Sequence, residues 1–159
     1  MPDDIFKCLK KKGLHFVHIN ARSLTPKLSE INYIVNKYNI AVLAISESWL
    51  ESSHTDASIK IEGYNVIRRD RETHAGGVCM YIRDDIVFNH RPDLQNQNFE
   101  DLWIEILLPR TKPIIVGTCY RAPKNNHTIE CLDNTLNMLD GNNEIFILGD
   151  FNICTLKKL

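Results

Sequence analysis

The most restrictive feature of this sequence is a strand–helix–strand pattern that occurs twice, once towards each end of the chain. In the first copy, strand-like apolar segments run from Leu14 to Ile19 and from Ile40 to Ser46. In the second copy they run from Ile114 to Tyr120 and from Glu144 to Leu148. Two strands joined through a helix are expected to be parallel, and such a crossover is almost always right-handed. The chain is therefore predicted to be an α/β protein.

Each predicted helix carries an apolar stripe. Thr25 is expected to cap the first helix, with Pro26 at its first position. The stripe of this helix consists of Leu28, Ile31, Val35 and Tyr38, and that of the second helix consists of Ile129, Leu132, Leu136 and Leu139. Both stripes have helical spacing and are expected to pack on a sheet.

Three further strand candidates lie between the two units, at Tyr64 to Arg68, Gly77 to Ile82 and Asp101 to Leu108. In the last candidate, the apolar side chains that alternate on one face are Leu102, Ile104, Ile106 and Leu108. Trp103 and Glu105 lie on the other face. The short linkers favour antiparallel pairing, and the two similar halves predict two mixed sheets packed face to face with helices outside.

Composition limits the class of protein. The 159 residues are 43% hydrophobic, which is enough for one domain; residues 1–12 read as a charged lead-in and 13–159 as the domain. The formal net charge is -1, so contacts with nucleic acid would depend on local basic clusters. Three such clusters are Lys7, Lys10, Lys11 and Lys12; Arg68, Arg69 and Arg71; and Arg110, Lys112, Arg121 and Lys124. Solvated surface is the alternative interpretation of each.

The five cysteines are scattered and form no C-x-x-C pair, which indicates free thiols rather than a zinc site. The first residues are charged, and no apolar run has the length of a membrane span. We therefore expect an intracellular protein that does not interact with membranes.

Polar side chains end the strands of both strand–helix–strand units. Asn20 and Glu47 follow the two strands of the first unit, and Tyr120, Asp150 and Asn152 follow those of the second. Parallel strands of one unit end at the same sheet edge, where open α/β sheets bind ligands. If the two units pack as related halves, these side chains meet at one rim. Such an oxygen-rich group with few carboxylates suits Mg²⁺ and the hydrolysis of a phosphate ester.

Each residue taken singly also has a structural interpretation. Glu47 could stabilise a helix N-terminus, Asn20 could belong to a turn, and Tyr120 could be a half-buried strand end. Asp150 is the strongest candidate, because a buried strand delivers it directly.

Five motifs in order carry a family resemblance. They are His18-Ile19-Asn20-Ala21-Arg22-Ser23-Leu24, Ser46-Glu47-Ser48-Trp49-Leu50, Arg68-Arg69-Asp70-Arg71 followed by Gly76-Gly77-Val78, Cys119-Tyr120-Arg121-Ala122-Pro123, and Gly149-Asp150-Phe151-Asn152. From about Leu14 to Asn152, the chain resembles the apurinic-endonuclease-like domain of LINE-type (non-LTR) retrotransposons, within the endonuclease/exonuclease/phosphatase superfamily.

The resemblance implies a four-layered α/β sandwich and a set of roles. Glu47 would be the main ligand of Mg²⁺, for which Mn²⁺ could substitute. Asn20 and Asn152 would hold the phosphate and the metal-bound water, and Tyr120 would contact the phosphate. Asp150 would position or activate the nucleophile.

The resemblance also implies a DNA substrate. The family nicks one DNA strand and leaves a 3′-hydroxyl that primes reverse transcription, so a reverse transcriptase encoded in the same element and a nuclear location are implied. Arg69 and Arg121 would contact the DNA backbone, with surface salt bridging as the alternative.

The chain departs from the family at its end, because the family continues to a closing Ser-Asp-His and this sequence stops at Leu159. We expect a C-terminally incomplete sandwich with impaired catalysis, either monomeric or prone to aggregation. Two alternatives stay open: a non-catalytic fragment that binds nucleic acid or protein, and a phosphatase or phospholipase of the same superfamily. The sequence around Arg22 and Arg121 favours the retrotransposon branch over the latter.

Overall fold

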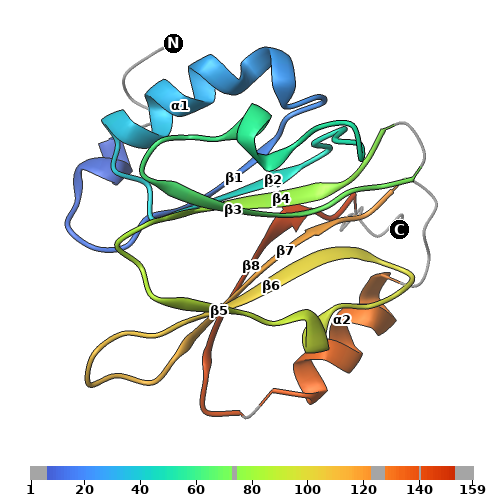
Figure 1. Cartoon of the computed structure of the whole chain (residues 1–159). Coiled ribbons are helices and arrows are strands. Elements are labelled where there is room, and N and C mark those ends of the chain that lie inside the picture. The colour runs from blue at the N-terminus through green and yellow to red at the C-terminus, as the bar shows by residue number, and fades with distance from the viewer. Residues whose placement is uncertain (1–6, 73–74, 123–127, 140, 153–159) are drawn as a thin grey trace, which may run out of the picture.

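The computed structural model describes residues 7–72, 75–122, 128–139 and 141–152, and these form two four-stranded sheets flanked by helices (Figure 1). The first sheet has the order β1-β2-β4-β3, with β1 (Phe16–Asn20), β2 (Val42–Ser46), β3 (Tyr64–Arg69) and β4 (Val78–Arg83). The second has the order β5-β6-β7-β8, with β5 (Phe88–His90), β6 (Glu100–Ile106), β7 (Ile114–Tyr120) and β8 (Glu144–Asp150). The predicted four-layered α/β sandwich is confirmed.

The helices lie on the outer faces of the two sheets, α1 (Leu28–Lys37) on the first and α2 (Thr128–Asn137) on the second (Figure 1). Four short 3₁₀ helices accompany them: η1 (Lys7–Lys10), η2 (Thr25–Lys27), η3 (Asp56–Ile59) and η4 (Pro92–Leu94). No helix in the described ranges has the length and apolar character needed to cross a bilayer.

Strand directions follow the predicted crossovers. β1 pairs in parallel with β2, with Asn20 opposite Ser46, and β7 pairs in parallel with β8, with Tyr120 opposite Asp150. The remaining pairs are antiparallel. The parallel pairs therefore bring the polar strand ends of each unit to one edge.

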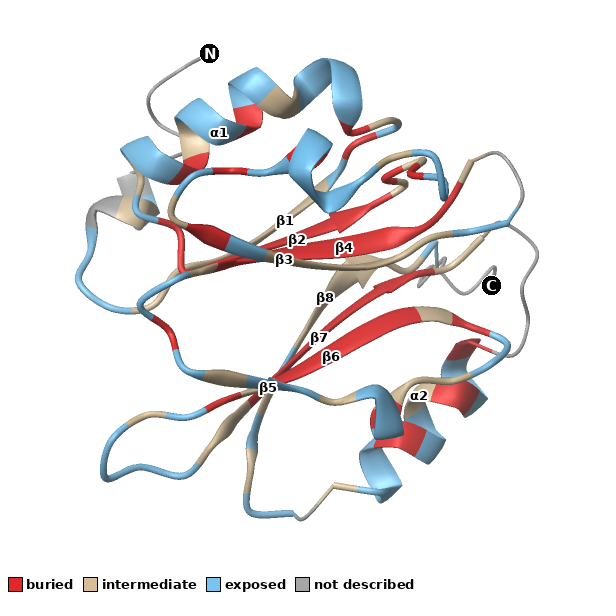
Figure 2. Ribbon diagram, in the orientation of Figure 1, coloured by how far each residue is buried: buried red, intermediate tan, exposed pale blue. Residues whose placement is uncertain are grey.

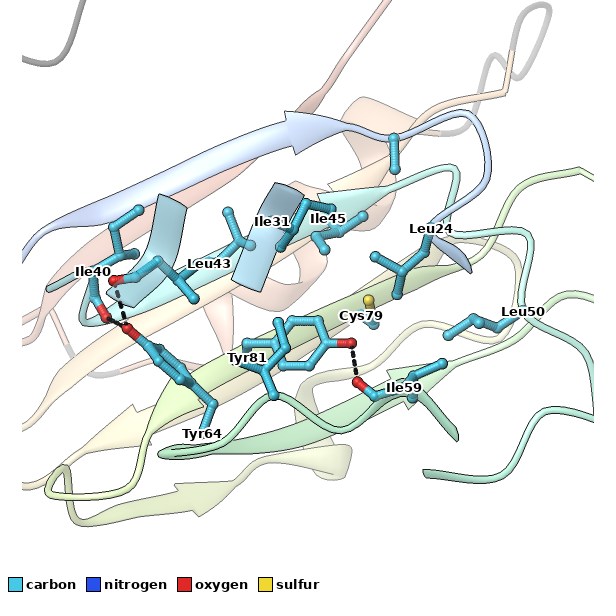
Figure 3. Packing of buried hydrophobic residues seen from close by; sticks show 13 residues of the cluster. Leu24, Ile31, Ile40, Leu43, Ile45, Leu50, Ile59, Tyr64, Cys79 and Tyr81 are labelled. Atoms are coloured by element: carbon cyan, nitrogen blue, oxygen red, sulfur yellow. Dashed lines mark hydrogen bonds between the residues drawn. The ribbon is translucent and has the colours of Figure 1, made fainter. Parts of the chain in front are cut away.

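Apolar clusters fill the spaces between the layers of the sandwich. Between the sheets, Ala44, Met80 and Val116 belong to one buried cluster, whereas Ile45 and Val35 belong to a second cluster between the first sheet and α1 (Figure 2). Buried phenols in the second cluster are hydrogen-bonded, as burial of a polar group requires. The hydroxyl of Tyr64 donates to the carbonyl of Ile40 at 2.7 Å, and that of Tyr81 to the carbonyl of Ile59 at 2.7 Å (Figure 3).

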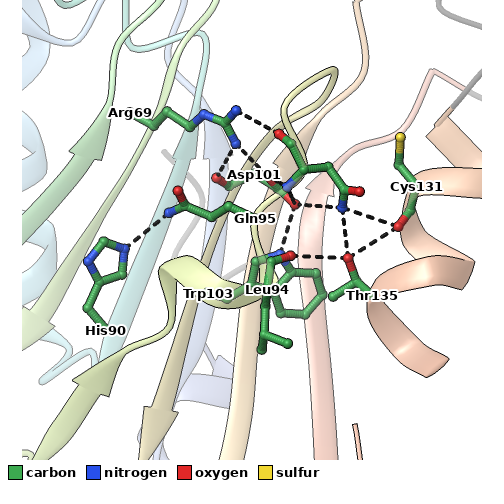
Figure 4. Close-up of polar contacts among 9 residues, drawn as sticks. Arg69, His90, Leu94, Gln95, Asp101, Trp103, Cys131 and Thr135 are labelled. Carbon is green, nitrogen blue, oxygen red and sulfur yellow. Dashed lines mark hydrogen bonds and ion pairs between the residues drawn. The ribbon is translucent and has the colours of Figure 1, made fainter. Parts of the chain in front are cut away.

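A buried polar network joins the second sheet to α2 (Figure 4). The carboxylate of Asp101 accepts the indole N–H of Trp103 at 2.9 Å, and the amide of Asn96 donates to the hydroxyl of Thr135 at 2.8 Å. Gly117 makes room for the indole, because a Cβ at this position would lie 2.4 Å from the ring of Trp103. The network sets how α2 lies on the sheet.

Two expectations about local structure were wrong, and one strand was missed. Thr25 lies inside a 3₁₀ turn and α1 begins at Leu28, so Thr25 does not cap this helix. In α2, Ile129 and Leu136 are 67% and 37% exposed, while Thr128, Cys131 and Thr135 face inward. The hydrogen bonds of Thr135 to η4 and Asn96 fix that rotation. Strand β5 was missed, because three residues are too few to show alternation.

Candidate active site

The carboxyl ends of β1 and β2 in one sheet and of β7 and β8 in the other form a single rim. The side-chain amide of Asn20 donates to Glu47 Oε1 at 2.8 Å and to Asp150 Oδ2 at 2.9 Å. One nitrogen thus touches a carboxylate from each sheet. The structure places all five predicted site residues, Asn20, Glu47, Tyr120, Asp150 and Asn152, at this rim.

Glu47 is held in an unusual backbone conformation. Its φ is 51°, and that of Trp49 is 53°, in the left-handed region that costs a residue with a side chain about 1 kcal/mol or more. Backbone hydrogen bonds stabilise this segment, from Ser23 to the carbonyl of Glu47 at 3.0 Å and from Trp49 to that of Gly76 at 3.0 Å. No helix begins between residues 47 and 55, so the interpretation of Glu47 as a helix-stabilising residue is wrong.

Gly77 allows the segment after β2 to approach the β3–β4 connection. Its φ is +78°, and a Cβ on Gly77 would lie 2.8 Å from the hydroxyl of Ser48. The conformation and the close approach both require glycine at this position.

Tyr120 is a hydrogen-bond donor at the rim. It ends β7, is only 8% exposed, and contacts Glu47. Burial, followed by the negative charge of Glu47, raises the pKa of Tyr120. The phenol therefore keeps its proton at neutral pH and can donate to an anionic oxygen.

Asp150 and Asn152 are positioned by a reciprocal contact with Arg121. The guanidinium of Arg121 donates to the carbonyl of Asn152 at 2.6 Å, and the amide of Asn152 donates back to the carbonyl of Arg121 at 2.9 Å. The backbone N–H of Arg121 donates to the carbonyl of Asp150 at 2.9 Å. Arg121 thus holds the turn that follows β8 through backbone carbonyls.

Arg69 also has a structural partner. Its guanidinium donates to the fully buried carboxylate of Asp101 at 2.6 Å and to the carbonyl of Asn96 at 2.6 Å (Figure 4). Arg68 binds the carboxylate of Asp70. This basic cluster is therefore largely neutralised within the protein. DNA contact by Arg69 or Arg121 stays a prediction.

The other two basic clusters are only partly described. Lys11, Lys12 and Arg110 are exposed, and Lys112 donates to the side chain of Asn142 at 3.3 Å. Lys124 lies outside the described residues.

His18 is a residue of the rim that the sequence alone did not single out. It lies two residues before Asn20 on the same face of β1, and its Nε2 is 3.1 Å from the hydroxyl of buried Ser46. Burial lowers the pKa of His18, and the charge of Asp150 opposes this effect. The signal available in the sequence was the period of two that puts His18 and Asn20 on one face.

The donor set suits a hard divalent cation with a largely water-filled coordination shell. Glu47 and Asp150 both reach the same amide of Asn20, so two carboxylates converge there. Mg²⁺ is commonly bound through one or two carboxylates, with water and substrate phosphate as the other ligands. Among the described residues, no group of three or more His, Cys, Asp or Glu side chains is placed to hold a metal ion by itself.

Comparison with known proteins supports the fold. The endonuclease domain of TRAS1, a telomere-specific non-LTR retrotransposon, is 14% identical, with a TM-score of 0.64 over 90% of this chain and 61% of its own. The 3′ phosphatase NExo from Neisseria is 17% identical, with a TM-score of 0.62 over 89% and 58%. An AP endonuclease from Archaeoglobus fulgidus is 16% identical, with a TM-score of 0.58 over 89% and 58%.

This chain spans about three fifths of the length of these structures. A search of curated protein sequences found no match. A sequence profile, in contrast, matches residues 16–155, which is most of the chain and includes every residue of the rim. On that match, the chain belongs to the endonuclease/exonuclease/phosphatase family.

Proposed function

We propose that this protein hydrolyses phosphodiester bonds of DNA in a Mg²⁺-dependent reaction, as a strand-nicking endonuclease of the retrotransposon type. The observation that carries the proposal is the amide of Asn20, which bonds Glu47 from one sheet and Asp150 from the other. Family membership supports the class of reaction, and the sequence around Arg22 and Arg121 supports the retrotransposon branch.

Each rim residue would have a separate task. Glu47 would hold Mg²⁺ or Mn²⁺, which supplies positive charge to the phosphate and acidity to water. Asp150 would orient and deprotonate the attacking water. The amide of Asn20 keeps the carboxylate of Asp150 beside that of Glu47. Tyr120 and Asn152 would donate hydrogen bonds to phosphate oxygens as their negative charge grows.

Hydrolysis also requires a proton for the departing oxygen, and we expect a low rate if His18, which lies near Asp150 at the rim, has to supply it. Its Nε2 bonds Ser46, and burial lowers its pKa, so it is a poor acid at neutral pH. If a 3′-hydroxyl is the product, it can prime a reverse transcriptase encoded in the same element.

The experiment is a plasmid-nicking assay with the wild-type chain and with Glu47→Gln and Asp150→Asn. These substitutions remove charge and keep shape. We expect both to reduce nicking by at least about a hundredfold. Glu62→Gln is the matched control, because Glu62 is an exposed surface residue paired with Lys60.

Nicking that depends on Mg²⁺ and fails in both rim variants would support the proposal. Equal nicking by all four proteins, or nicking that survives chelation of divalent ions, would contradict it. Mn²⁺ serves as a second test of the site, since it accepts the same oxygen ligands.

A second candidate function is protein binding without catalysis. It is favoured by β8, which among the described residues pairs only with β7, and by the exposed apolar side chains of Phe146, Ile129 and Met138. An unpaired apolar edge is a site for addition of a strand. DNA binding independent of metal and without nicking would instead indicate a nucleic-acid-binding fragment.

A further inference from the structure

A hollow of about 530 Å³ lies beside the rim, and Tyr120 belongs to both. One wall is the end of β3 with the following residues, Arg69 to Glu72. The opposite wall is the segment Gln97 to Glu100, which leads into β6, and Ala122 lines the hollow after Tyr120. A group covalently attached to a phosphate at Tyr120 can therefore reach this hollow.

We propose that this hollow binds the sugar and base of the nucleoside next to the reacting phosphate. The inference rests on the proposed function and deepens it, since it names the part of the substrate that the chain recognises. The volume lies within the range of small-ligand sites. Ala122 and the nearly buried Phe99 and Tyr120 supply the apolar part of the lining, and the exposed side chain of Gln97 supplies an amide group that can bond a base edge.

The charges of the hollow favour an uncharged occupant. Its two arginines are each paired with a carboxylate, Arg69 with Asp101 at 2.6 Å and Arg71 with Glu100 at 3.3 Å. Two further carboxylates, those of Asp70 and Glu72, also line the walls.

Binding of a second phosphate in the hollow would be unfavourable, because phosphate sites use cations or N–H groups that are not already bonded to carboxylates. A nucleoside carries no charge at neutral pH. The hollow therefore fits a nucleic-acid substrate better than a head group with several phosphates.

The test uses two diesters with the same leaving group, thymidine 5′-(4-nitrophenyl phosphate) and methyl 4-nitrophenyl phosphate. The ratio of their kcat/KM values measures what the nucleoside contributes. We expect the wild-type ratio to favour thymidine by about tenfold or more, and Ala122→Phe, which fills the hollow, to remove most of that preference. Gln97→Ala changes an exposed side chain and provides a second variant whose folding is not at risk.

Ala57→Phe is the matched control, because Ala57 is exposed and does not line the hollow. Its ratio should equal that of the wild type. A wild-type ratio near one, or a ratio unchanged in both hollow variants, would overturn the inference while leaving metal-dependent hydrolysis intact.

Binding of thymidine 5′-monophosphate and of methyl phosphate, measured by calorimetry, gives a readout that does not require turnover. Absence of turnover of both diesters would count against the proposed function. Equal affinity for the two monoesters would count against the nucleoside site. Tighter binding of thymidine 5′-monophosphate that weakens in Ala122→Phe would support the site.

Discussion

Strands β2 and β8 occupy the same place in their two strand–helix–strand units, yet they differ in burial. Every residue of β2 is buried, whereas β8 is half-buried along its length and exposes Glu144 and Phe146 (Figure 2). Each strand ends at a carboxylate of the rim, Glu47 after β2 and Asp150 at the end of β8.

The difference in burial comes from the number of strands that each of the two strands has beside it in its sheet. β2 has β1 on one side and β4 on the other, but β8 pairs only with β7 among the described strands. The carboxylates of Glu47 and Asp150 are therefore positioned by different kinds of contact. Glu47 is fixed by a buried strand, while Asp150 depends on contacts from Asn20 and Arg121.

The largest predicted effect compares the same substitution in the two strands. Ile45→Ala removes a fully buried side chain from β2 and should lower the free energy of unfolding by about 4 kcal/mol. Ile147→Ala in β8 should cost only about 1 kcal/mol, since Ile147 is half-buried. Urea unfolding followed by tryptophan fluorescence measures both. Equal losses would show that β8 is covered in solution.

A second prediction concerns the close contact between β8 and β7. A Cβ on Gly149 would lie 2.2 Å from the carbonyl oxygen of Cys119 in β7. Gly149→Ala should therefore cost about 3 kcal/mol of unfolding free energy, because the backbone must move. Gly141→Ala is the control, since a Cβ there meets nothing within 4 Å. Its effect should stay within about 1 kcal/mol of zero. Similar behaviour of the two variants would mean that the strands are farther apart.

Much of this arrangement could be predicted from the sequence, because strand and crossover rules act locally. The parallel strands and the meeting of Asn20 with Glu47 and Asp150 follow from where polar residues end apolar strands. The rotation of α2 could not be predicted, since it depends on the hydrogen bond between Asn96 and Thr135, 39 residues apart.

The partners of the arginine residues could not be predicted from the sequence either. An arginine beside a predicted site has the same sequence pattern whether it binds DNA or a distant carboxylate. Only the tertiary structure shows that Arg69 reaches Asp101, and that Arg121 bonds the turn carrying Asn152.

A third prediction tests whether the exposed side of β8 promotes self-association. Phe146 is 41% exposed and contacts Phe16 edge-on, with ring centroids 5.1 Å apart. Phe146→Lys should raise the concentration at which the chain associates by about tenfold, because charge on an edge strand opposes pairing. Sedimentation velocity over a concentration series measures this.

The control is Val87→Lys, which adds the same charge at an exposed position outside the strands. Equal effects of both would assign the change to net charge, and a wild-type chain that stays monomeric throughout would contradict the expected association.

The smallest predicted effect concerns His18, which lies between the two regions, bonded to Ser46 of β2 and near Asp150 of β8. Burial lowers the pKa of His18 in the folded state below its ordinary value of about 6.5. The unfolded chain therefore binds the proton at higher pH than the folded chain, so the contribution of His18 to stability falls as the pH drops below about 6.5.

The substitution His18→Gln keeps a hydrogen-bonding group and does not titrate. It should flatten the stability profile between about pH 6.5 and 5 by about 0.5 kcal/mol, because solvent screens a half-buried group. The difference between the urea midpoints of the two proteins at each pH measures the effect. A steeper loss of stability in His18→Gln on acidification would show that Asp150, rather than burial, dominates the pKa of this histidine.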